Sequence, residues 1–131
     1  MKKLLLIFTL LFSTLMFSTP SYGEWMGVST NVSGTTFYVD FERIRKHDGY
    51  VYFWIMSNLL RPDESGTLSG KGYYQGDCKL FRFKGLSYSF HKEPMGKGTG
   101  DSSNPKNPEL EYPPPNSVSE TVLKSVCKYA K

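Results

Sequence analysis

The sequence predicts an α+β fold, an antiparallel β-sheet of about five to six strands with one C-terminal helix packed on one face and pinned by a disulfide. Three observations predict it. Short runs that alternate apolar and polar residues are separated by turn residues, which is typical of hairpin-connected strands. A helical period follows the three consecutive prolines that end at Pro115. Of the two cysteines, Cys78 lies among the strands and Cys127 in the helical stretch.

Residues 1–23 have the layout of a secretory signal peptide. Lys2 and Lys3 precede an apolar run that ends at Phe17, and Ser21 and Gly23 fit the −3 and −1 positions of a cleavage site. A spanning anchor needs about twenty apolar residues, and this run is shorter. We therefore expect cleavage after Gly23, export to the periplasm, cell surface or medium, and no stable membrane span afterwards.

The remaining residues, 24–131, predict a single domain. Removing 23 of the 131 residues leaves 108, enough for one modest core. The cleaved segment takes two lysines with it, so the formal net charge falls from +4 to +2. Such a weak charge on an exported chain does not favour nucleic acid, and we expect no nucleic-acid partner.

The first strands are expected near the start of this domain. One begins at Trp25, and a turn at Gly34 leads to the strand "FYVDF" at residues 37–41. Asp48 and Gly49 are a strong hairpin signal, because both tolerate the left-handed backbone of a two-residue turn.

The stretch that follows, "YVYFWIMSNLL", is predicted to be a central strand with two apolar faces. Its β-branched and aromatic residues favour a strand over the alternative, a buried helix. We assign Val51, Phe53 and Ile55 to the side covered by the helix. The opposite row suits a partner interface, unless the 91–116 connection folds back over it; it consists of Tyr52, Trp54 and Met56.

A strand, a short break around Gly76 and Asp77, and a long strand from about Cys78 to Phe90 are expected next. A β-bulge at Gly85 would bring five apolar residues to one face: Phe81, Phe83, Leu86, Tyr88 and Phe90. Residues 91–116 hold six of the eight prolines and are expected to lack regular structure. So long a connection is functional or mobile.

The helix is expected to start after Ser117, which can cap it, with Glu120 closing a capping box. Its apolar stripe faces the sheet; it consists of Val118, Val122, Leu123, Val126, Cys127 and Ala130. Two cysteines in an exported chain favour one disulfide, Cys78 with Cys127, over two free buried thiols.

Catalytic and metal motifs are missing from the sequence. His47 lies next to a turn and His91 at a strand end, and the two cysteines and two histidines lack ligand spacing. We therefore expect no catalytic residues, no metal and no cofactor. A cationic cluster, Arg43, Arg45 and Lys46, suits contact with a polyanion and equally a solvated turn.

Several motifs together resemble the bacterial surface-adhesin protein E family. They are an N-terminal tryptophan, "FYVDFERI", "GDCKLFRF", "YSF" followed by "MGKGTG", and "PPPNS" before a helix that contains "VC". The likeness covers nearly all of residues 24–131. It implies an antiparallel sheet with a packed C-terminal helix, a Cys78–Cys127 bridge, and adhesion to host matrix proteins such as laminin and vitronectin, and to plasminogen.

The leading hypothesis is an exported, non-enzymatic binding domain, adhesin-like, that engages an extracellular or envelope macromolecule. Its partner would be a protein or matrix glycoprotein, or a second copy in a homodimer. One alternative is a small periplasmic enzyme or inhibitor that uses the 91–116 loop, for which His91 and Asp101 are the residues to substitute. A purely structural, self-associating envelope domain is another.

Overall fold

The structure, a computed structural model, describes residues 24–131, so the expected signal peptide lies outside the described residues. The strands in chain order are β1 (Trp25–Thr30), β2 (Thr36–Asp40), β3 (Arg45–His47), β4 (Tyr50–Asn58), β5 (Ser69–Asp77), β6 (Arg82–His91) and β7 (Gly100–Ser103). Two 3-10 turns, η1 (Phe41–Arg43) and η2 (Pro94–Gly96), and the helix α2 (Val118–Tyr129) complete the described chain.

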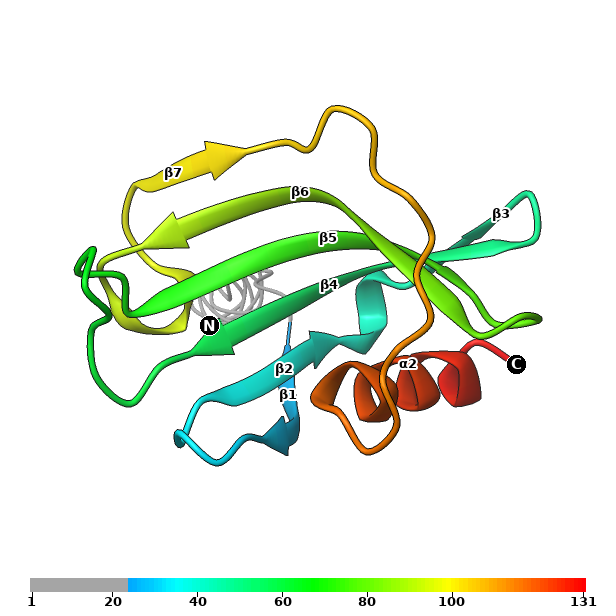
Figure 1. Cartoon of the computed structure of the whole chain (residues 1–131), viewed down its shortest axis with the longest axis horizontal. Helices are drawn as coiled ribbons and strands as arrows, with labels where there is room; N and C mark the ends of the chain where they lie inside the picture. Colours follow the sequence, from blue (N-terminus) through cyan, green and yellow to red (C-terminus); the bar gives the residue numbers. More distant parts are fainter. Residues whose placement is uncertain (1–23) are drawn as a thin grey trace, which may run out of the picture.

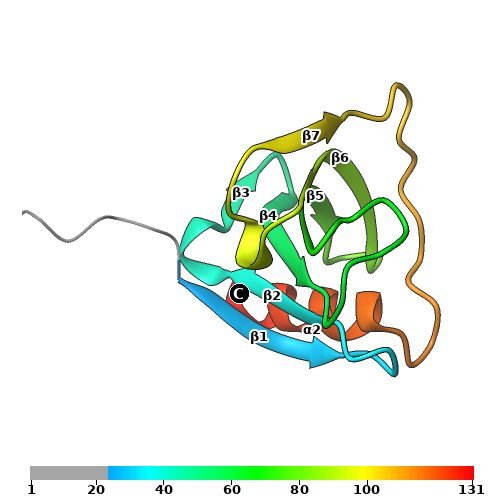
Figure 2. The same cartoon turned by 90° about the vertical axis from the view of Figure 1, so that its left-hand side faces the viewer.

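All strands belong to one antiparallel sheet in the order β1-β2-β4-β5-β6-β7, with β3 paired to β4. The sheet is curved, and α2 and the chain that leads to it lie on one side (Figures 1 and 2). We call this side the helix face and the opposite side the outer face. The expected antiparallel sheet with one packed C-terminal helix is confirmed.

The sheet has one strand more than expected, because the 91–116 connection is partly ordered. Gly100–Ser103 pairs with β6 as an edge strand, and Glu111 forms an isolated bridge with Phe83. The predicted hairpin at Asp48 and Gly49 is confirmed, with φ angles of 51° and 81° in the left-handed region.

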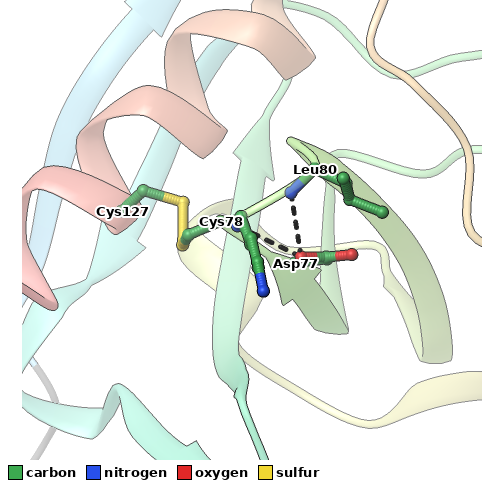
Figure 3. Close-up of a disulfide and its surroundings, with 5 residues drawn as sticks. Asp77, Cys78, Leu80 and Cys127 are labelled. Atoms are coloured by element: carbon green, nitrogen blue, oxygen red, sulfur yellow. Dashed lines mark hydrogen bonds between the residues drawn. A yellow bond between two sulfur atoms is a disulfide. The ribbon is translucent and has the colours of Figure 1, made fainter.

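The break expected at Gly76 and Asp77 is wrong, since β5 continues through both residues. The turn comes later and contains Cys78, so the long strand starts at Arg82. The Asp77 carboxylate sets this turn by accepting hydrogen bonds from the amides of Lys79 and Leu80, each 3.1 Å (Figure 3). Sequence periodicity does not register such a side-chain-to-backbone turn, so the predicted start of the strand comes four residues too early.

The bulge predicted at Gly85 is present. Tyr73 pairs with Ser87 and Tyr74 with Gly85, which leaves Leu86 without a partner on β5. The shift brings Phe83, Tyr88 and Phe90 to the helix face, where they line one pocket. Phe81 also packs against the core on this face, although it lies in the turn before β6, with a φ of 56°, and not in the strand.

Helix α2 begins at the predicted cap: the Ser117 hydroxyl accepts a hydrogen bond from the Glu120 amide at 3.1 Å. The predicted capping box is not closed, because the Glu120 carboxylate accepts from the Asn116 amide at 3.3 Å and not from the Ser117 amide. The core consists of the predicted helix stripe packed on the strands, and its buried members are Val39, Val51, Phe53, Val122, Leu123 and Val126. Gly76 permits this close approach, since a Cβ there would lie 3.2 Å from a Leu123 methyl group and 3.0 Å from Val51.

The predicted disulfide is present between Cys78 and Cys127, with a Cα–Cα distance of 5.6 Å (Figure 3). It joins the β5–β6 turn to the last turns of α2 and closes a loop of 49 residues. An isolated helix of twelve residues is marginal in water, so the bond adds to the packing that holds α2 on the sheet.

Replacing both cysteines by serine should lower the free energy of unfolding by about 2–5 kcal/mol, because the bond restricts the unfolded chain. Urea denaturation measures this, and hydrogen exchange should show α2 losing protection first. Lys128→Ser, an exposed change on the same helix turn, is the control. Equal midpoints for the double variant and wild type would contradict the stabilising role.

Asp77 predicts a specific loss of stability in acid. The hydrogen bonds from the Arg82 guanidinium, at 2.8 Å and 3.2 Å, and then from the Leu80 amide lower the pKa of its carboxyl. A depressed carboxyl pKa adds stability that is present above the unfolded value of about 3.9 and is lost as the pH falls through the folded value.

Asp77→Asn should therefore be less stable than wild type by a constant amount above about pH 5, and the difference should shrink below about pH 4. Urea denaturation from pH 3 to pH 7 measures it. Arg82→Gln should remove most of this pH dependence. A difference that does not change with pH would show that the carboxylate charge is not the cause.

Candidate functional site

The outer face carries an aromatic patch, defined as Tyr52, Trp54 and Tyr73. Trp54 and Tyr73 lie opposite each other on β4 and β5, with ring centroids 4.8 Å apart, and the Tyr52 and Tyr73 centroids are 6.1 Å apart. All three side chains are partly exposed. Rings held by each other and by paired strands form a preformed contact surface, since little side-chain freedom remains to be lost on binding.

Met56, the third residue of the predicted interface row, is not accessible. It is fully buried, although it lies on the outer face opposite Lys71. The η2 turn lies against this end of β4, where the Met95 amide donates to the Asn58 side chain at 2.8 Å and the Gly96 amide donates to the Ser69 hydroxyl at 2.8 Å. The 91–116 connection therefore covers one end of the row and leaves Tyr52 and Trp54 open.

The cations of the predicted cluster do not stay together. Arg45 pairs with Tyr52 and so shares the outer face, whereas Lys46 pairs with Val51 on the other face. Gln75 and Lys84 continue the row on the far side of Tyr52. Within residues 24–131, neither Arg45 nor Lys84 forms an ion pair, so both charges remain available to an anionic group.

Arg43 has a structural partner. Its Nε lies 3.3 Å from Oδ2 of Asp40, which is 1% exposed. The contact is an ion pair without hydrogen-bond alignment, because neither Asp40 carboxylate oxygen has a hydrogen-bond partner among the described residues. Arg43 therefore neutralises a buried charge, and its contact with a polyanion stays an untested prediction.

His91 lies at the end of β6, as expected, and its side chain is buried. Its Nε2 lies 2.9 Å from the Ser89 hydroxyl and its Nδ1 lies 3.1 Å from the Gly98 carbonyl oxygen. A serine beside a histidine is the start of a nucleophile–base arrangement, yet here a backbone carbonyl stands where a triad has an acid. Asp101 pairs with Phe90, so it points to the opposite face from His91. The contacts of His91 hold the 91–100 loop against the sheet.

A pocket of about 350 Å³ lies on the helix face, beside the first turns of α2. Its floor contains Ile55, Gly70 and Gly72, its walls include Phe37 and Tyr88, and its helix side is Val118, Val122 and Leu123. Sequence analysis missed it. The available signal was the glycine alternation in "SGKGYYQG", which removes side chains from one face of β5.

Two further properties of the described residues concern metal binding and membrane crossing. No group of three or more His, Cys, Asp or Glu side chains in residues 24–131 is placed to hold a metal ion. Among the same residues, no helix has the length and apolar content needed to cross a membrane.

The family model described as "Surface-adhesin protein E" matches residues 25–128. The chain belongs to the surface-adhesin protein E family. Membership confirms the resemblance and favours adhesin-like binding at a surface over catalysis. No curated protein matched the chain.

Solved structures of Haemophilus influenzae protein E share the fold. One crystal form has a TM-score of 0.63 at 20% identity, covering 86% of this chain and 94% of that one. Protein E from non-typeable Haemophilus influenzae has a TM-score of 0.58 at 17% identity, covering 85% and 79%. These similarities support the architecture of the surface-adhesin protein E family for this chain.

The two arginines of the predicted cluster should behave differently on substitution. Arg43→Gln should lower the free energy of unfolding by about 1–3 kcal/mol, because it leaves the buried Asp40 carboxylate unpaired. We expect a value toward the lower end of this range, since the Arg43 side chain is half exposed and solvent screens its charge. Arg45→Gln is the matched control and should change stability little. Chemical denaturation compares them, and equal stabilities would contradict the structural role of Arg43.

Proposed function

We propose that this chain is an exported, non-enzymatic binding domain whose contact surface is the aromatic patch. The observation that carries the proposal is the placement of Tyr52, Trp54 and Tyr73 as a packed yet partly exposed cluster on the face that α2 leaves uncovered. Tyrosine, tryptophan and arginine are the residues most enriched at interaction hot spots.

The charges around the patch indicate the kind of partner. Arg45 and Lys84 lie at the two ends of the row that contains Tyr52 and Gln75, and no acidic residue takes part in that row. Because such cations attract and orient acidic surfaces, the partner is an acidic patch on a protein or matrix glycoprotein. Laminin and vitronectin, which the family resemblance suggests, are the first candidates to test.

Trp54→Ala should weaken binding to that partner about thirtyfold, because removing one aromatic anchor costs about 2 kcal/mol. Biolayer interferometry with immobilised matrix glycoproteins measures the dissociation constant, and circular dichroism checks the fold. Tyr112→Ala, an exposed aromatic outside the patch, is the control and should bind normally.

Equal losses for Trp54→Ala and Tyr112→Ala, or no saturable binding by wild type, would contradict the proposal. Sedimentation of the same proteins tests the homodimer. If wild type is a dimer and Trp54→Ala is a monomer, the patch joins two copies of this chain instead of contacting another molecule.

A further inference from the structure

The helix-face pocket differs from the aromatic patch in chemistry and position. Its lining is mainly apolar, with two serines and two tyrosines among the lining residues, and it opens beside Phe90, which is 46% exposed. Protein interiors are normally packed without voids much larger than a water molecule. A pocket of about 350 Å³ that continues into the core residues Phe53, Val122 and Leu123 falls within the size range of small-molecule sites.

None of the residues that the structure describes presents a charge inside this pocket. Lys71 takes part in the lining, but its side-chain carbons lie next to Gly96 of η2, on the outer face. Burial, together with the neighbouring Tyr88, raises the pKa of the Tyr74 phenol, so that hydroxyl stays neutral. A buried ionic group would therefore lack a partner here, and the part of a ligand that enters must be uncharged.

The pocket extends across several strands as well as along them. Across the sheet its lining runs from Phe37 on β2 to Tyr88 on β6, about 14 Å for three strand spacings of about 4.8 Å. Its lining extends from Phe53 to Ser57 on β4 and from Gly70 to Tyr74 on β5, about 13 Å at 3.3 Å per residue. Gly70 contributes to its depth, because a Cβ there would reach within 3.3 Å of the Ser57 hydroxyl and 3.7 Å of the Phe90 ring. A flexible hydrocarbon chain carries no charge and can bend to follow the walls, so it suits a wide, shallow, mainly apolar hollow of this size.

We propose that this pocket binds the acyl chain of a single-chain amphiphile, with the polar headgroup outside, near Ser57 and Phe90. This function is additional to macromolecular binding at the aromatic patch and does not depend on it. The walls are preformed, since the disulfide and the packing of Leu123 fix α2 against the sheet. Little conformational entropy is then lost when the chain enters.

Straight-chain fatty acids test the proposal on the processed, disulfide-bonded protein. Displacement of N-phenyl-1-naphthylamine fluorescence, below micelle concentrations, should show affinity rising roughly fourfold for each added methylene group. The rise should stop once the chain exceeds the length of the pocket. Saturable binding with this plateau supports the proposal, and binding that is absent or independent of chain length overturns it.

Ser57→Leu fills the pocket above Gly70 and should weaken dodecanoate binding at least tenfold. Ser87→Leu is the matched control, because Ser87 lies on the outer face opposite Tyr73, and it should change the affinity less than twofold. If Ser57→Leu does not fold, as judged by near-ultraviolet circular dichroism, Ser57→Val replaces it in the test, because valine places a smaller side chain in the pocket.

Equal affinities for the two leucine variants would overturn the pocket as the binding site. The proposal also fails if Ser57→Leu weakens binding of a matrix glycoprotein while no fatty acid binds the wild type. In that case the pocket receives an apolar side chain of a protein partner.

Discussion

The contact between α2 and the helix face of the sheet is the constraint on which the rest of the structure depends. Leu123 packs against Val51 and Phe53 at a place where Gly76 has no side chain, so helix and strands approach closely. The Cys78–Cys127 bond fastens the last turns of the same helix to the β5–β6 turn. Packing and covalent bond act at neighbouring points, and together they hold a helix too short to be stable by itself.

One helix cannot cover a sheet of this width, and the uncovered parts are the candidate sites. The helix lies mainly over β1 and β2, so a hollow over the central strands and β6 remains beside its first turns. On the outer face, η2 covers Met56 and stops short of Tyr52 and Trp54. Both sites are therefore parts of the sheet that neither the helix nor the η2 turn covers. Rigid strands form their base, as is typical of binding sites.

The sequence was informative where a regular period decides the structure. It predicted the two faces of β4, the capped C-terminal helix and the bulge in β6, because strands and helices have fixed repeats. It failed where a single side chain decides. The predicted strand starts too early, at Cys78, because the turn depends on the Asp77 carboxylate. The sequence also left open whether the 91–116 connection covers the interface row, because the segment over Met56 is held by single contacts from Asn58 and Ser69. Neither contact follows a period.

Strand β5 shows how one stretch of sequence can serve two surfaces. In "SGKGYYQGD", Gly70, Gly72, Tyr74 and Gly76 face the helix side, and Lys71, Tyr73 and Gln75 face outward. The glycines give the pocket its depth and admit the helix, while the outward residues complete the aromatic patch and its polar edge. Because successive side chains point to opposite faces, a change at an outward position leaves the pocket lining in place, and the two surfaces can vary independently.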